Sequence, residues 1–297
     1  MRGPTPLPDR LLDCTDPEGR EHALERAAAA VREGKVVVLP TDTVYGVGAD
    51  AFDVVAVSMV LAAKHRGREM PPPVLVPTPR TVDGLAVDVP MYARILMRQF
   101  WPGPLTLVLR SQPSLQWDLG EANGTVALRM PDDEVALTLL ADVGPMAVTS
   151  ANVTGHPAAT TAQEAMDQLT GAVSVYLDDG PRTGGAASTI LDCTGEEPVV
   201  LRVGALAPDD IRAVLGTTVL HDSPPPRGEP GAEQGDGLDG AQEGAQNRSE
   251  AAEPASETGG AALVGSVRPS GIAIPRDAVR VLHPEAAQEL PPEAPAP

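Results

Sequence analysis

Three short stretches of the sequence combine side chains that could bind a phosphorylated ligand. Residues 40–50 contain two threonines and two aspartates directly after an apolar run, and loops at the ends of buried strands are where α/β proteins place ligands. Residues 64–68 hold three cations within five positions, a density that suits a polyphosphate. Residues 149–155 present a Ser-x-Asn pair, which can offer a hydroxyl and an amide to one ligand.

Each stretch also has a purely structural interpretation. The polar side chains of residues 40–50 could bond their own backbone in a strand-to-helix turn. The cations of residues 64–68 are favourable at the C-terminus of a helix whatever they bind, and a Ser-x-Asn pair can simply cap the next helix. Residues 45–48 lack the third glycine of a dinucleotide fingerprint, and nothing in the sequence matches a P-loop. A nucleotide site here would be of another kind.

The elements that must position these residues alternate between helices and strands. Residues 16–34 predict a helix, with Asp16 as N-cap, Pro17 at the first position and Gly34 as the stop. Residues 36–39 are a continuous apolar run, typical of a strand buried on both faces. Further strands are predicted at residues 73–76, 105–109, 125–129, 146–148, 174–177, 189–192 and 199–203. Further helices are predicted at residues 53–63, 90–99, 132–142, 161–169 and 208–215. This mixture predicts an α/β (α+β) fold, a sheet with flanking helices.

The large packing residues stop well before the end of the chain. All aromatic residues precede residue 180, and nothing after Leu201 offers a large anchor, so we expect a packed domain over residues 1–216. Residues 217–297 are acidic and rich in Pro, Gly and Ala, a composition that predicts disorder. Within them, residues 271–282 carry enough Ile, Val and Leu to form a short docking element.

Charge and cysteine content exclude several classes of protein. The net charge of −19 argues against tight nonspecific binding to a polyanion, although it allows a local basic cleft. Cys14 and Cys193 are too few and too distant for a zinc site or a disulfide framework. Because the chain shows no signal peptide and no apolar run of about 18–20 residues, we expect a cytoplasmic protein without a membrane span.

The ordered set of motifs resembles one family, the YrdC/Sua5 threonylcarbamoyl-AMP synthases. The motifs that carry the resemblance are residues 40–48, Lys64-x-Arg66, residues 101–106, residues 125–131, Ser150-x-Asn152, residues 188–192 and residues 201–204. The resemblance covers about residues 12–215 and implies a YrdC-like fold, in which a twisted mixed sheet surrounds a deep, positively lined cavity.

The resemblance also implies which side chains bind each substrate. The ATP site would consist of Lys64, Arg66, Arg68, Thr125, Ser150, Asn152 and Arg202. The L-threonine site would consist of Thr41, Arg129 and Ser188. Lys64 and Arg66 would have the catalytic role, and Arg129 would pair with the threonine carboxylate, a task that suits a guanidinium.

The implied reaction makes threonylcarbamoyl-AMP for the threonylcarbamoyladenosine (t6A) modification of tRNA. Bicarbonate and the threonine amine would give N-carboxy-threonine, whose carbamate oxygen attacks the α-phosphorus of ATP and expels pyrophosphate. Rate would come from positioning and charge stabilisation, with no nucleophilic side chain. We expect Mg²⁺ to accompany the triphosphate, with no dedicated protein metal site. The product would pass to a tRNA threonylcarbamoyl transferase complex.

The sequence departs from the family pattern after the Lys-x-Arg pair. The family usually has Pro where this chain has Gly67, and a triple proline follows at residues 71–73, so we expect a differently shaped phosphate loop. Two other functions stay open. One is a carbamoyltransferase of the same fold, as in hydrogenase maturation, which normally has an acylphosphatase domain and Cys-x-x-Cys motifs that this sequence lacks. The other is a noncatalytic RNA-binding or ribosome-maturation protein. The negative charge opposes a broad RNA surface but leaves a weak RNA contact open.

Overall fold

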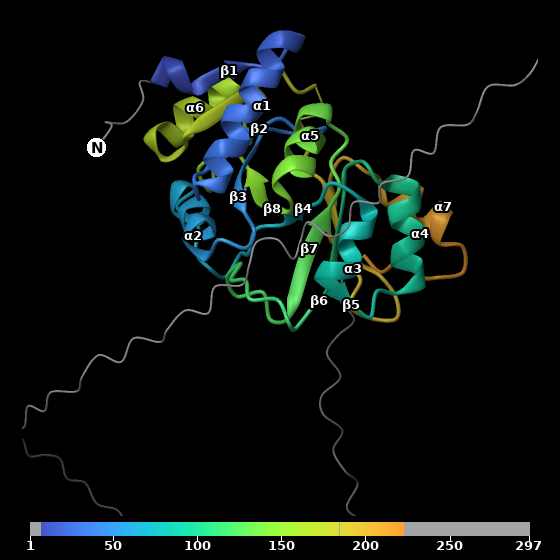
Figure 1. Ribbon diagram of the computed structural model, residues 1–297. Helices are drawn as coiled ribbons and strands as arrows, with labels where there is room; N and C mark the ends of the chain where they lie inside the picture. Colours follow the sequence, from blue (N-terminus) through green and yellow to red (C-terminus); the bar gives the residue numbers. More distant parts are fainter. Residues whose placement is uncertain (1–6, 184, 223–297) are drawn as a thin grey trace, which may run out of the picture. The chain divides into compact units, whose positions relative to one another are not determined.

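A mixed sheet organises the part of the chain that the computed structural model describes, residues 7–183 and 185–222 (Figure 1). Its strand order is β1-β9-β2-β3-β8-β4-β7-β6-β10-β11, with β5 paired to β6. The strands are β1 (Leu11–Asp13), β2 (Val37–Leu39), β3 (Gly46–Asp50), β4 (Val74–Leu75), β5 (Ala86–Val87), β6 (Leu105–Ser111), β7 (Thr125–Arg129), β8 (Met146–Ser150), β9 (Val175–Asp178), β10 (Thr189–Asp192) and β11 (Val199–Arg202). The sheet contains parallel pairs such as β4/β7 and antiparallel pairs such as β6/β7, so the predicted mixed sheet is confirmed.

Helices cover the sheet in three groups (Figure 1). The helices are α1 (Pro17–Arg32), α2 (Val54–Ala63), α3 (Val82–Leu85), α4 (Met91–Phe100), α5 (Glu134–Val143), α6 (Ala162–Leu169) and α7 (Pro208–Leu215). Single 3-10 turns lie at Leu7–Arg10, Pro79–Thr81 and Thr170–Ala172. Helices α1 and α5 share one apolar cluster with β2, β8 and β9, α2 and α6 share a second, and α3, α4 and α7 share a third. The sheet is therefore flanked by helices, as the alternation predicts.

Helix α1 begins and ends as its sequence predicts. The Asp16 side chain accepts a hydrogen bond of 3.1 Å from the amide of Gly19, and Pro17 occupies the first helical position. Beyond the last turn, Gly34 has a φ of +70°, a left-handed conformation that glycine adopts without a steric penalty. The apolar run that follows forms β2, whose three residues are all buried.

The prediction of a loop over residues 40–50 is wrong for its second half, which forms β3. This strand pairs antiparallel to both β2 and β8. Its glycines misled the prediction, because glycine inside a strand weakens the usual pattern. Here the neighbouring strand requires them: a Cβ on Gly46 or Gly48 would lie 2.6 or 2.5 Å from a methyl group of Val148. The short elements β1, β5 and α3 were also missed.

Strand β6 shows how the sheet divides its side chains between core and site. Leu105, Leu107 and Leu109 are fully buried in the cluster that contains α4 and α7. Thr106 and Val108 point to the opposite face and line a pocket. Because side chains alternate along a strand, one sequence of seven residues supplies both the support of the site and part of its wall.

The described chain continues to pack beyond Gly216. Leu220 is buried in the cluster with α7, and His221 forms a parallel bridge with Val199 of β11. Residues 223–297, including the proposed docking element at residues 271–282, lie outside the described residues, so the division at residue 216 stays a prediction. No helix in the described part has both the length and the apolar character needed to cross a membrane.

Candidate active site

A pocket of about 470 Å³ lies over seven consecutive strands of the sheet, from β3 to β11 in sheet order. Its walls come mainly from one face of these strands and from the loops between them. The polar and charged side chains that line it are Thr41, Thr43, Tyr45, Arg66, Thr106, Thr125, Arg129, Thr149, Ser150, Ser188 and Arg202. This volume lies in the range of sites that enclose a small organic ligand.

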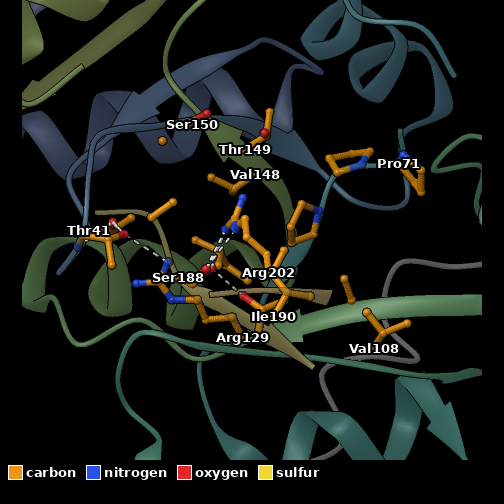
Figure 2. Close-up of a pocket in the computed structure, with 18 of the residues that line it drawn as sticks. Thr41, Pro71, Val108, Arg129, Val148, Thr149, Ser150, Ser188, Ile190 and Arg202 are labelled. Carbon is orange, nitrogen blue, oxygen red and sulfur yellow. Dashed lines mark hydrogen bonds between the residues drawn. The ribbon is translucent and has the colours of Figure 1, made fainter. Parts of the chain in front are cut away.

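The pocket brings together most of the predicted site residues. Seven of the ten line it: Thr41, Arg66, Thr125, Arg129, Ser150, Ser188 and Arg202. Figure 2 shows Thr41, Arg129, Ser188 and Arg202 close to one another, with Thr149 and Ser150 on a separate strand. The other three predicted residues, Lys64, Arg68 and Asn152, do not line the pocket and have other contacts.

Two arginines face the pocket without a carboxylate partner. The Nη1 of Arg66 donates to the Thr149 hydroxyl at 3.0 Å, and Arg202 donates through Nε and Nη2 to the Ser188 carbonyl at 3.1 and 2.7 Å. In the part of the chain that the structure describes, neither guanidinium forms an ion pair, and the Nε of Arg66 has no partner. Burial lowers the pKa of Arg66, the charge of Glu69 opposes that shift, and the charge of Arg202 adds to it. Two close cations without a directly paired carboxylate favour an anionic ligand.

Arg129 differs because a carboxylate already neutralises it. Its Nη2 pairs with Asp42, its Nη1 donates to the Thr43 hydroxyl at 3.1 Å, and its Nε donates to the Gly103 carbonyl at 3.0 Å. Burial lowers the pKa of Arg129, and Asp42 opposes that shift. A guanidinium has five N–H donors, so the three contacts hold Arg129 in place and leave two donors for a ligand.

The hydroxyl groups of the pocket are also oriented by the protein. Thr41 donates to the Val44 carbonyl at 2.6 Å, and its oxygen lies 3.0 Å from that of Thr43. The Ser188 hydroxyl lies 2.9 Å from that of Thr106. Such contacts fix the lone pairs before a ligand arrives, which reduces the reorganisation that binding requires.

Lys64 lies outside the pocket lining, against the end of β8 at Ser150 and the turn that follows it. Its side chain is 2% exposed, and its ammonium donates to the carbonyls of Ser150 and Asn152 and, at 3.2 Å, to the Asn152 side-chain oxygen. Burial, followed by the charge of Arg66, lowers the pKa of Lys64 to about 8. Lys64 therefore ties the end of α2 to the turn that carries Ser150.

Asn152 and Arg68 also make protein contacts. The side-chain nitrogen Nδ2 of Asn152 donates to the carbonyls of Val153 and His156 at 2.9 and 2.8 Å, and these bonds hold the turn over residues 152–156 together. Arg68 is half exposed and pairs with Asp118 at 2.6 Å, and its carbonyl accepts from the Glu121 amide at 2.8 Å. Arg68 thus connects two loops beside the pocket, residues 64–72 and 112–124.

Sequence reasoning missed Asp42 as the partner of Arg129 and gave no role to three hydroxyls of the pocket wall. Thr43, Thr106 and Thr149 all lie within the motifs already noted, so their positions were visible. The alternation of strands would have placed Thr106 on one face of β6, but not shown that this face lines a pocket. Within residues 7–183 and 185–222, no group of three or more His, Cys, Asp or Glu side chains is arranged to hold a metal ion.

Fold and site together define an α/β protein with a cationic, hydroxyl-lined pocket on a mixed sheet, without a P-loop. The family model Sua5/YciO/YrdC, which carries the description "Telomere recombination", matches residues 29–204. A putative threonylcarbamoyl-AMP synthase from Mycobacterium tuberculosis (strain H37Rv) is 54% identical over 205 residues, covering 69% of this chain and 94% of the relative. The chain belongs to the Sua5/YciO/YrdC family.

Relatives with lower sequence identity agree with this assignment. The threonylcarbamoyl-AMP synthase of Pyrococcus abyssi is 38% identical over 202 residues, which cover 68% of this chain and 59% of that protein. The crystal structure of P. abyssi Sua5 with L-threonine matches with a TM-score of 0.67 and 35% identity, covering 71% of this chain and 62% of that one. The predicted YrdC-like fold is therefore confirmed.

Proposed function

We propose that this chain is an L-threonylcarbamoyladenylate synthase, which converts ATP, L-threonine and bicarbonate to threonylcarbamoyl-AMP and pyrophosphate for the t6A modification of tRNA. One observation carries the proposal: Arg66, Arg129 and Arg202 converge on one pocket in a chain that is 54% identical to a putative synthase of this kind. The pocket has the charge for a triphosphate and, separately, a neutralised arginine for an amino acid.

The triphosphate binds at the two arginines that have no directly paired carboxylate. Arg66 and Arg202 neutralise its charge, and Ser150 donates a hydroxyl to a phosphate oxygen. Thr125 contacts the nucleotide from β7. Lys64 and Asn152 act through the turn that they hold, so their role is to position Ser150. We expect Mg²⁺ to arrive with ATP as part of the substrate, held mainly by phosphate oxygens and water.

L-threonine binds at the neutralised arginine. The two remaining donors of Arg129 receive the carboxylate, while Thr41 and Ser188 bond the rest of the amino acid. Because Asp42 offsets the charge of Arg129, this side of the pocket suits a zwitterion better than a phosphate. The two substrates thereby have distinct places within one pocket.

The chemistry requires no covalent intermediate with the protein. The threonine amine adds to the carbon of bicarbonate, and loss of water gives N-carboxy-threonine. One carbamate oxygen then bonds to the α-phosphorus of ATP while the bond from that phosphorus to the β-phosphate oxygen breaks, releasing pyrophosphate. Arg66 and Arg202 stabilise the charge that develops on the phosphoryl oxygens, and the walls hold the reactants in line.

The reactivity of the product indicates which partner the enzyme needs and where it acts. An acyl-adenylate is reactive toward water, so we propose delivery to a tRNA threonylcarbamoyl transferase complex in the cytoplasm. A weak contact with RNA is compatible with this role, but the net charge of −19 does not suit a broad RNA surface.

Pyrophosphate release tests the proposal directly. Purified protein with ATP, L-threonine and bicarbonate should release pyrophosphate, and omission of either L-threonine or bicarbonate should reduce the release to background. Circular dichroism and a thermal shift with ATP serve as controls for folding and nucleotide binding. Folded, ATP-binding protein that releases no pyrophosphate in response to L-threonine would contradict the proposed function.

A further inference from the structure

A buried ionic cluster lies beside the threonine side of the pocket but outside its lining. Arg182 is at its centre: Nη1 pairs with Asp133 at 2.8 Å, and Nη2 pairs with Asp179 at 3.0 Å. The side chain of Arg182 is 14% exposed and that of Asp133 is 6% exposed. The guanidinium carbon also lies 5.6 Å from the centre of the Tyr45 ring, within the range of a cation–π contact.

These contacts join three segments that are distant in the sequence. Asp133 caps α5, where it accepts from the Ala136 amide at 2.9 Å, and Asp179 follows β9. The third segment is the loop after β2, reached through Tyr45, whose hydroxyl donates to the Gly180 carbonyl at 2.7 Å. A planar guanidinium can bridge two carboxylates and stack on a ring at the same time, whereas an ammonium cannot.

Each of the three segments carries one of the proposed threonine contacts. Thr41 lies on the loop that ends at Tyr45, Arg129 ends the strand that leads to α5, and Ser188 follows the segment of Arg182. That last segment contains glycines with positive φ, +76° at Gly180 and +58° at Gly185. Glycine gives a backbone many alternatives, so this segment needs contacts that restrict it, in addition to the bonds that Ser188 itself forms with Arg202 and Thr106.

We propose that Arg182 is a positioning residue for L-threonine, which fixes the relative placement of Thr41, Arg129 and Ser188 by bridging Asp133, Asp179 and Tyr45. Among the described residues, the charged groups that face it are these two carboxylates, and Arg20 approaches Asp179 at 3.4 Å from elsewhere. The inference rests on the proposed function and names a residue that does not itself touch substrate.

Steady-state kinetics of Arg182→Ala tests the proposal. We expect the KM for L-threonine to rise roughly tenfold or more, because small displacements of binding groups have large effects, while the KM for ATP changes less than about twofold. Isothermal titration with L-threonine provides a readout besides activity and should show the same loss of affinity. Arg182→Lys keeps the charge but not the bridge, so its KM should stay clearly above that of the wild type.

Arg20→Ala is the matched control. Arg20 contacts the same Asp179 and pairs with Glu134 at 2.8 Å, but within the described chain no hydrogen bond or ion pair joins it to Tyr45 or Asp133. Its loss should leave both KM values near those of the wild type. If Arg182→Ala does not fold, Asp133→Asn replaces it, since asparagine can still cap α5 but lacks the charge. A smaller rise in the same KM is then expected.

Three results would overturn the inference: equal threonine KM values for Arg182→Ala and Arg20→Ala, an equal rise in the KM for ATP, or full recovery in Arg182→Lys. The wild type separates this failure from failure of the proposed function. If the wild type neither releases pyrophosphate nor binds L-threonine, the proposed function and the inference that rests on it are both wrong. If the wild type does both, only the role of Arg182 is in question.

Discussion

The arginines of the pocket are in two different electrostatic states. Arg129 is buried and paired with Asp42, whereas Arg66 and Arg202 contact only hydroxyls and carbonyls of the described chain. A paired arginine offers directed donors with little net charge, and an unpaired one offers charge itself. Under the proposed function, this difference separates the place of a zwitterionic substrate from that of a polyanionic one through the neutralisation of a single guanidinium.

Removal of an unpaired arginine should have the largest effect. Arg66→Ala is expected to lower the rate of pyrophosphate release by about 100-fold or more, because a fixed donor to the reacting phosphates is lost. Folding should be retained, since Arg66 forms no ion pair in the described part of the chain. Kinetic assays alongside thermal unfolding check both points. A variant that turns over near the normal rate would show that phosphate does not bind at Arg66.

Removal of the Asp42 carboxylate, which pairs with Arg129, should affect stability before it affects activity. Asp42→Asn keeps an acceptor for the Asp132 amide but leaves the buried Arg129 charge unpaired. We expect the free energy of unfolding to fall by about 3 kcal/mol, measured by urea denaturation. Arg202→Ala, which breaks no ion pair among the described residues, is the comparison variant. Equal stability losses in the two variants would contradict the distinction between the paired Arg129 and the unpaired Arg202.

The buried Lys64 predicts a pH dependence of stability. Its folded-state pKa of about 8 lies below the unfolded value of 10.5, so the unfolded chain binds more protons between these pH values. The contribution of Lys64 to the free energy of unfolding should therefore rise from pH 8 to pH 10.5, by about 3 kcal/mol. Urea denaturation of wild type and Lys64→Met across this range measures it as a growing difference. A constant difference would mean that Lys64 keeps its ordinary pKa.

The exposed Arg68 should have the smallest effect. It pairs with Asp118 outside the pocket lining, and an exposed pair of this kind contributes about 0–1 kcal/mol. Arg68→Ala is thus expected to change the KM for ATP by less than about threefold. The same assay applied to Arg66→Ala provides the scale. A loss as large as that of Arg66→Ala would place Arg68 on the phosphates, as the family resemblance implies.

Residue patterns predicted the framework of the fold better than the details of the site. Strands β7 and β10 have the predicted boundaries, because alternating or continuous apolar residues mark buried strands. Strand β3 was missed because Gly46 and Gly48 serve close contact with Val148, a requirement that only the neighbouring strand reveals. Similarly, the motifs predicted that Lys64 lies near Ser150. They did not show that its ammonium binds the carbonyls of Ser150 and Asn152 outside the pocket lining.

A crystal structure with a nonhydrolysable ATP analogue and L-threonine tests the central claim most directly. We expect phosphate oxygens within hydrogen-bond distance of Arg66, Arg202 and Ser150, and the threonine carboxylate on Arg129 with the Asp42 pair intact. Phosphates bound at Arg129, or the two substrates in separate pockets, would contradict it.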